Sequence, residues 1–207
     1  MSVKATLERL VAIAPPAINQ ITKPGQPHCV LSTSVGLMVL DALGIQAEPY
    51  VAEIHICNKA WMDWADHNFA GGREEQLRRG AYLLTNMPNW KGASFKSVKV
   101  DKPWDGHLVL RVPDGETTWL VDLDLGSFNR PQFNVKLPLG MMAKLRDNTV
   151  VGTFTKDGTR TAVAYRPLVA PYAEDYQTAR DWVERDRFAD IVEKLVEVVA
   201  RPHTVGP

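Results

Sequence analysis

Cysteine is scarce in this 207-residue chain, which contains only Cys29 and Cys57. So few cysteines exclude a disulfide-rich scaffold, and without a secretory context a disulfide between them is the less favoured use of the pair. The chain also lacks an apolar run of about 18 residues and the apolar core of a signal peptide. These absences predict a soluble, cytoplasmic protein with no membrane partner.

An excess of charge of one sign is missing as well, because 24 Lys and Arg balance 24 Asp and Glu. Balanced charge gives no indication of binding to nucleic acid or to an anionic membrane surface. Hydrophobic residues make up 45% of the chain, which is enough for a sizeable core. We therefore expect a single domain over residues 1–207, without internal repeats or low-complexity tracts.

The N-terminal part of the chain predicts two helices and a strand. Residues 3–14 have helical spacing of apolar side chains, and Pro15-Pro16 is expected to end that helix. Residues 28–44 are apolar around nearly the whole helical circumference, which is typical of a buried central helix, and Gly44 is its natural stop. Residues 47–57 alternate as a strand does.

Residues 58–102 are interpreted as an insertion with helices at 59–69 and 73–84. Its aromatic residues could line a cleft, although such residues more often form ordinary core packing. They are Trp61, Trp64, Phe69, Trp90 and, just beyond the insertion, Trp104.

The C-terminal half predicts a short helix around residues 139–145, then a second hairpin formed by residues 149–155 and 161–166. Residues 173–201 are predicted to be helical. Four apolar residues there have coiled-coil spacing and should pack on the domain, or alternatively form the seam of a homo-oligomer. They are Phe188, Ile191, Leu195 and Val198.

A hairpin over residues 106–122 carries the strongest local signal in the chain. Asp114-Gly115 is a preferred two-residue hairpin loop, since Asp and Gly tolerate positive φ. With these residues as the loop, His107 lies directly opposite Asp122, where a carboxylate can accept a hydrogen bond from an imidazole. In the same register Asp124 faces Asp105 and is the weaker partner, and a different loop length would shift the pairing.

Cys29 lies at the first turn of the predicted central helix. Free N–H groups and the helix macrodipole at that position lower a thiol pKa and favour the nucleophilic thiolate. A free cysteine is more often just a small buried hydrophobic residue. The His107–Asp122 pair tips the interpretation towards a nucleophile.

The segments HCVLSTSVGLMVLDALGIQAEPYVAEI, GHLVLRV and WLVDLD occur in that order. Together they resemble the papain-like superfamily, and more closely its transglutaminase-like branch, over about residues 28–57 and 105–124. The chain departs from the family pattern in the long separation of Cys29 from His107 and in Leu108, where an aromatic residue is common. The resemblance implies an α+β papain-like fold, with helices packed on an antiparallel β-sheet.

The resemblance also implies a catalytic triad of Cys29, His107 and Asp122 that acts through a thioester and needs no cofactor or metal. Gln26 is a weak candidate for an oxyanion donor by analogy with the family. His28 and Trp104 are weak candidates for contact with substrate.

We expect a peptidase or amidase acting on a peptide, protein or small amide. Acyl transfer of the transglutaminase or arylamine N-acetyltransferase type is the first alternative. The second is a non-catalytic papain-like binding module. His55, Cys57, Asp63, Asp66 and His67 are metal-competent residue types, but they lack the spacing of a known zinc motif, so no metal site is predicted.

Overall fold

The computed structural model describes residues 1–22, 28–86, 106–168 and 173–201. Six α-helices and seven strands occur in these ranges. The helices are α1 Val3–Ile21, α2 Cys29–Ala42, α3 Lys59–Asp66, α4 Gly72–Arg79, α5 Arg180–Val183 and α6 Ala189–Ala200. The strands are β1 Glu48–Asn58, β2 Leu83–Asn86, β3 His107–Asp114, β4 Thr117–Asp122, β5 Met141–Lys144, β6 Val150–Lys156 and β7 Thr159–Pro167.

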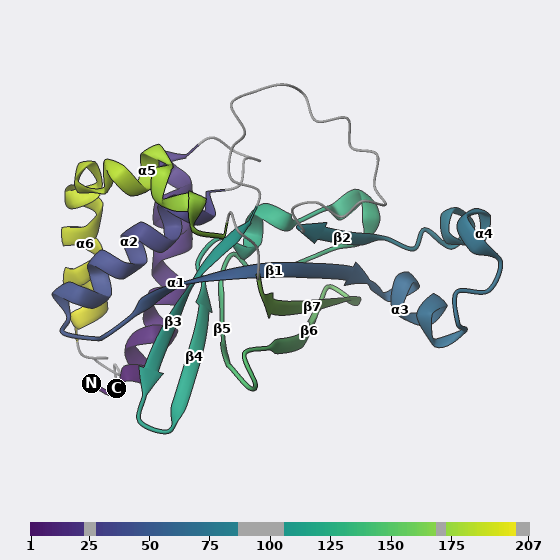
Figure 1. Ribbon diagram of the computed structural model, residues 1–207, viewed down its shortest axis with the longest axis horizontal. Coiled ribbons are helices and arrows are strands. Elements are labelled where there is room, and N and C mark those ends of the chain that lie inside the picture. Colours follow the sequence, from purple (N-terminus) through teal and green to yellow (C-terminus); the bar gives the residue numbers. More distant parts are fainter. Residues whose placement is uncertain (23–27, 87–105, 169–172, 202–207) are drawn as a thin grey trace.

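The strands form one antiparallel sheet in the order β5-β4-β3-β1-β7-β6, with β2 paired to part of β1. The sheet curls into a nearly closed barrel. Helices α1, α2, α5 and α6 gather at one end of the molecule, and α3 and α4 lie beyond the far end of β1 (Figure 1). The predicted arrangement of helices on an antiparallel sheet is thus confirmed.

Two apolar cores lie on opposite faces of the β3–β4 hairpin. Leu110 and Val112 pack in a cluster with α1, α2 and α6, whereas Val109 and Leu120 pack in a second cluster inside the barrel. Alternating side chains of a strand point to opposite faces, so one hairpin supplies both cores. The hairpin is therefore fixed from both sides.

Close packing of α2 against the sheet depends on Gly36. A Cβ added at this glycine would lie 2.7 Å from Leu110 Cδ1 and 2.8 Å from Leu123 Cδ1. Thr33 adds a hydrogen bond from its hydroxyl to the Leu108 carbonyl, 2.9 Å long. The backbone of α2 can therefore approach β3 closely along its N-terminal half.

The expected end of the first helix at Pro15-Pro16 is wrong, because α1 continues to Ile21. The apolar stripe runs past the prolines, since Ala14 is fully buried and Ile18 is 1% exposed. Tertiary burial on this stripe outweighs the hydrogen bonds that two prolines remove. Proline propensity alone gives the wrong boundary here.

Two further helical predictions are corrected. The second insertion helix was predicted over residues 73–84, but α4 spans only residues 72–79. It ends there because Gly80 adopts a left-handed φ of 62°. Leu83 and Leu84 then pair with Cys57 and Ile56 as strand β2. Residues 141–144 in the predicted short helix are instead strand β5, which pairs with β4.

The other elements follow the sequence more closely. Strand β1 matches the alternation of residues 47–57 to within one residue at each end. The second hairpin forms around Asp157 and Gly158, which both have positive φ, with Lys156 paired to Thr159. Helix α6 buries Leu195 in the cluster with α1 and α2, so its apolar face packs within the domain. The predicted C-terminal helix is however divided into α5, α6 and two short 3-10 segments, Ala173–Thr178 and Arg185–Phe188.

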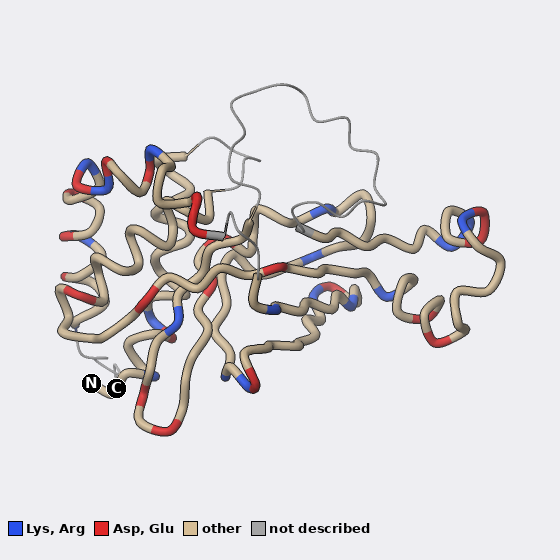
Figure 2. The backbone as a smooth tube through the Cα atoms, in the orientation of Figure 1, with Lys and Arg blue, Asp and Glu red and all other residues tan. Residues whose placement is uncertain are grey.

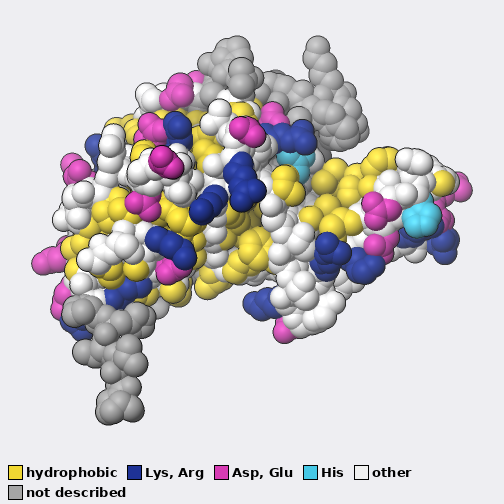
Figure 3. All heavy atoms as spheres, turned by 90° about the horizontal axis from the view of Figure 1, so that it is seen from below, with side chains coloured by type: hydrophobic (Ala, Val, Ile, Leu, Met, Phe, Trp, Pro, Cys, Tyr) yellow, Lys and Arg dark blue, Asp and Glu magenta, His cyan; other side chains and the backbone are white. Residues whose placement is uncertain are grey.

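Charged residues are spread over the structure. Figure 2 shows acidic and basic residues along both the helical end and the α3–α4 end. On the face seen in Figure 3, Lys and Arg are interspersed with Asp and Glu among hydrophobic side chains. No helix within the described ranges is both long and apolar enough to cross a membrane.

Candidate active site

The β3–β4 hairpin has a register two residues away from the predicted one. Asp114 pairs with Thr117, and Leu110 pairs with Val121, so Gly115 and Glu116 form the loop. Only Gly115 of the two has a positive φ, at 59°, as in a turn with glycine at its first central position. The prediction that His107 lies directly opposite Asp122 is therefore wrong.

The two residues nevertheless meet. A shift of two residues keeps every side chain on the same face, and diagonal neighbours on one face are within reach of an aromatic ring. His107 Nε2 lies 2.8 Å from Asp122 Oδ2. Both side chains are completely buried. The pairing expected from sequence is thus present, by a diagonal contact.

Asp122 accepts hydrogen bonds from three separate parts of the chain. Besides His107 Nε2, the Tyr165 hydroxyl donates to Asp122 Oδ2 over 2.7 Å, and the Asp124 backbone N–H donates to Oδ1 over 2.7 Å. A fully buried carboxylate is tolerated only when it is paired in this manner. The carboxylate is held rigidly, and Phe128 packs edge-on against the imidazole at 4.9 Å between ring centroids.

These contacts set the pKa of each partner. Burial acts against the charged imidazole, but the charge and hydrogen bond of Asp122 and the neighbouring Cys29 raise the pKa of His107 well above its usual value. Burial likewise acts against the Asp122 carboxylate, but His107, Tyr165 and the Asp124 N–H lower its pKa. An imidazolium paired with a carboxylate is the favoured state of the site.

Cys29 is the first residue of α2, as predicted, and follows the N-cap residue His28. It is 8% exposed and packs with Leu108 of β3 and Tyr176. Its thiol is close enough to His107 to raise the imidazole pKa. The ring nitrogen Nδ1 has no hydrogen bond of standard geometry to any described residue, and it is therefore the nitrogen available to a thiol proton.

Asp124 belongs to the same site and was undervalued from the sequence. Its Oδ2 accepts the His28 backbone N–H at the N-terminus of α2 over 2.8 Å. Burial, followed by the charge of Asp122, raises the pKa of Asp124 to about 6. The spacing of two residues from Asp122, which puts both acids on one face of an extended strand, is a signal that could have identified it.

The remaining sequence candidates divide into two groups. His28 donates its backbone N–H to Asp124 at the helix N-cap, and contact of its ring with substrate stays a prediction. Gln26 and Trp104 lie outside the described residues, as does Trp90.

The aromatic residues of the α3 region do not line the site around Cys29. Trp61, Trp64 and Phe69 pack against one another, with ring centroids 5.0–5.6 Å apart. Within the described residues no group of three or more His, Cys, Asp or Glu side chains could hold a metal ion.

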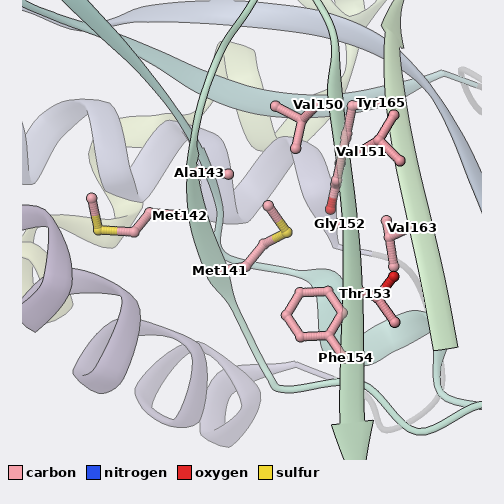
Figure 4. Close-up of a pocket in the computed structure, with 10 residues that line it drawn as sticks. All are labelled: Met141, Met142, Ala143, Val150, Val151, Gly152, Thr153, Phe154, Val163 and Tyr165. Carbon is pink, nitrogen blue, oxygen red and sulfur yellow. The ribbon is translucent and has the colours of Figure 1, made fainter. Parts of the chain in front are cut away.

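An apolar pocket lies between the sheet edges β5 and β6 (Figure 4). Its lining includes Met141, Phe154 and Tyr165, but not Cys29 or His107. Tyr165 connects this pocket to the site, since its hydroxyl binds Asp122. The pocket therefore adjoins the site through Tyr165, and the Cys29 thiol does not line it.

Comparison with known proteins gives no match to any protein family, to any curated protein or to any solved structure. The chemistry of the site therefore has to be judged on its geometry. A thiol at a helix N-terminus, a buried imidazole and a carboxylate bonded to that imidazole are the groups that a nucleophile, a base and an orienting acid require.

Proposed function

We propose that this protein is a cysteine-dependent amide hydrolase of the transglutaminase-like type. The observation that carries the proposal is the fully buried His107–Asp122 hydrogen bond of 2.8 Å. It is supported by the effect of Cys29 on the same imidazole, whose pKa the neighbouring thiol helps to raise. A buried ionic pair costs stability unless its groups are well bonded, so its presence beside a thiol favours a functional role.

The order of elements supports the likeness to transglutaminase-like enzymes. Cys29 begins a helix that packs on the sheet, His107 begins β3, and Asp122 ends the adjacent strand β4. The sheet is antiparallel and curls towards a barrel. Helices packed on an antiparallel sheet are compatible with the proposed papain-like fold, although fold alone does not establish an activity.

In the proposed reaction, the proton of the Cys29 thiol passes to His107 to give a thiolate–imidazolium pair, and the thiolate attacks the carbonyl carbon of an amide. The developing oxyanion is stabilised at the positive end of α2, because the first N–H groups of a helix have no partner within the helix. His107 then protonates the leaving amine, and the C–N bond breaks to leave a thioester on Cys29. Water, deprotonated by His107, hydrolyses the thioester and restores the thiol.

Asp122 keeps the imidazole in the tautomer that presents Nδ1 to the thiol. Because its carboxylate bonds Nε2, the Nε2–H proton is fixed and Nδ1 is free to exchange a proton. Its role is orientation and charge stabilisation, so its loss should harm turnover less than loss of Cys29 or His107.

The test is to incubate a broad mixture of peptides with the wild type or with Cys29→Ala. Mass spectrometry then detects new peptide termini. We expect cleavage by the wild type only, with His107→Ala as inactive as Cys29→Ala and Cys57→Ala as active as the wild type. An added primary amine incorporated into peptides would instead identify an acyl transferase. Identical products from the wild type and Cys29→Ala would contradict an enzyme and favour a non-catalytic binding module.

A further inference from the structure

Asp124 connects the two halves of the candidate site. Its side chain accepts the His28 N–H at the start of α2, while its own backbone N–H donates to Asp122. One residue thus bonds both the chain segment that leads into Cys29 and the carboxylate that orients His107. Asp124 is 6% exposed, so these bonds are shielded from solvent.

A residue in this place can fix the position of the nucleophile relative to the sheet. Helix α2 is otherwise attached to β3 by apolar packing and by the Thr33 hydroxyl one turn further along. Apolar packing is not directional, whereas a charge-assisted hydrogen bond to a backbone N–H fixes distance and direction.

We propose that Asp124 is a positioning residue, whose carboxylate holds the first turn of α2 and Cys29 in place against the His107–Asp122 pair. This inference rests on the proposed function and adds a fourth residue to it. Asp124 acts through its neighbours and does not itself touch the reacting atoms.

The charge of Asp124 should matter as well as its shape. The titratable groups that face it are Asp122 at the end of β4, His107 at the start of β3, His28 at the N-cap of α2 and Tyr165 of β7. Asp122 raises the pKa of Asp124, and His107 lowers it, because an imidazolium attracts a carboxylate. By reciprocity, ionised Asp124 favours the imidazolium and hence the thiolate–imidazolium state of the site.

Two variants separate the bond from the charge. Asp124→Asn keeps an oxygen acceptor of the same shape for the His28 N–H but has no charge, whereas Asp124→Ala loses both. The measurement is the second-order rate constant for alkylation of Cys29 by iodoacetamide between about pH 5 and pH 8, which needs no known substrate. Circular dichroism and the alkylation rate of Cys57 report whether each variant is folded.

For Asp124→Asn we expect the wild type to variant rate ratio to be close to one at about pH 5, where the wild-type carboxyl is itself neutral. The ratio should rise to about threefold to tenfold above pH 7, with a midpoint near the pKa of about 6. For Asp124→Ala the ratio should already be about tenfold at about pH 5, because the acceptor is missing in both protonation states. It should rise further above pH 7, because the charge of the wild-type carboxylate is then lost as well. A purely structural role would give ratios that do not depend on pH.

Rates for both Asp124 variants equal to those of the wild type would overturn the positioning role, provided that His107→Ala still slows alkylation. A pH-independent loss in Asp124→Asn would overturn it too. If His107→Ala also alkylates at the wild-type rate, the proposed enzyme itself fails, so the two failures are distinguishable.

Discussion

At the scale of single residues, the site is organised around a buried carboxylate and the donors that make its burial tolerable. The donors to Asp122 come from β3, from β7 and from the chain just after β4. Only the His107 donor could be anticipated from the hairpin pattern. Tyr165 is more than forty residues further along the chain, and a lone tyrosine in an alternating strand carries no signal of its partner.

Tyr165→Phe removes one of these donors and little volume. We expect the free energy of unfolding to fall by about 1–3 kcal/mol, because a hydrogen bond to a buried charged group is lost. Alkylation of Cys29 should slow at the same time, since the carboxylate that orients His107 is less well held. Chemical denaturation and the alkylation rate measure the two effects.

Tyr50→Phe is the matched control for that substitution. Its hydroxyl donates to the Asn148 carbonyl at an exposed position, 2.7 Å away. The same chemical change there should alter stability by well under about 1 kcal/mol and leave the alkylation rate unchanged. Equal effects of the two tyrosine variants would show that the Tyr165–Asp122 bond is not special.

The raised pKa of Asp124 predicts that its ionised carboxylate lowers the stability of the fold. A carboxyl whose pKa is raised on folding stabilises the fold below its unfolded pKa of 3.8, and that contribution is lost as the pH rises through about 6. Asp124→Asn should therefore be more stable than the wild type at pH 7.5, by up to roughly 3 kcal/mol, and the difference should shrink towards about pH 4. Urea unfolding of both proteins at both pH values measures this difference in stability. The prediction is contradicted if the stability of the variant relative to the wild type is lower at pH 7.5 than at pH 4.

At the scale of elements, the β3–β4 hairpin brings His107 and Asp122 together as predicted, but in a register that differs from the predicted one. The loop is Gly115-Glu116 because Asp114 stays in the strand, where its Oδ2 accepts the Trp119 indole N–H over 3.1 Å. A dipeptide preference does not include this contact, because its two residues are five positions apart. The apolar alternation survives any shift of two residues, so it identifies the face of His107 and Asp122 but not their opposition.

The same distinction explains the other boundaries. The strand β1 and the second hairpin follow from alternation and turn residues in the sequence itself. By contrast, Pro15 within α1 and strand β5 at residues 141–144 depend on distant partners. Gly140, for example, is so close to the Asp122 carbonyl that an added Cβ would be 2.8 Å from it.

The position of α2 on the sheet should be sensitive to Gly36. In Gly36→Ala the new methyl would overlap Leu110 and Leu123, so we expect destabilisation of about 1–3 kcal/mol and slower alkylation of Cys29 as α2 is displaced. Gly152→Ala is the control, because an added Cβ there has no atom within 4 Å. Similar melting temperatures and alkylation rates for the two variants would argue against close α2 packing as the source of the site's geometry.

At the scale of the whole molecule, the aromatic residues around α3 form a local cluster. Trp64 packs with Trp61 and Phe69, and its indole N–H donates to the Ala70 carbonyl over 2.8 Å. This cluster lies beyond the end of β1, away from α2, the helix that carries Cys29 (Figure 1). These three aromatic residues therefore pack with one another and do not line the thiol.

Trp64→Ala should therefore loosen the α3 region without changing the thiol. Hydrogen exchange should increase over α3 and α4, whereas the alkylation rate of Cys29 should remain within about twofold of the wild type, because the packing lost is local. A large fall in the alkylation rate would show that this region is coupled to the site.

We propose that folding brings one of the two cysteines, Cys29, to an imidazole that activates it. Burial raises the pKa of Cys57, which should keep that thiol slow. The most direct measurement is the rate of iodoacetamide alkylation of each cysteine near neutral pH, in the wild type and in His107→Ala. We expect Cys29 to react much faster than Cys57, and His107→Ala to remove the difference. Slow and equal alkylation of both cysteines in the wild type would contradict it.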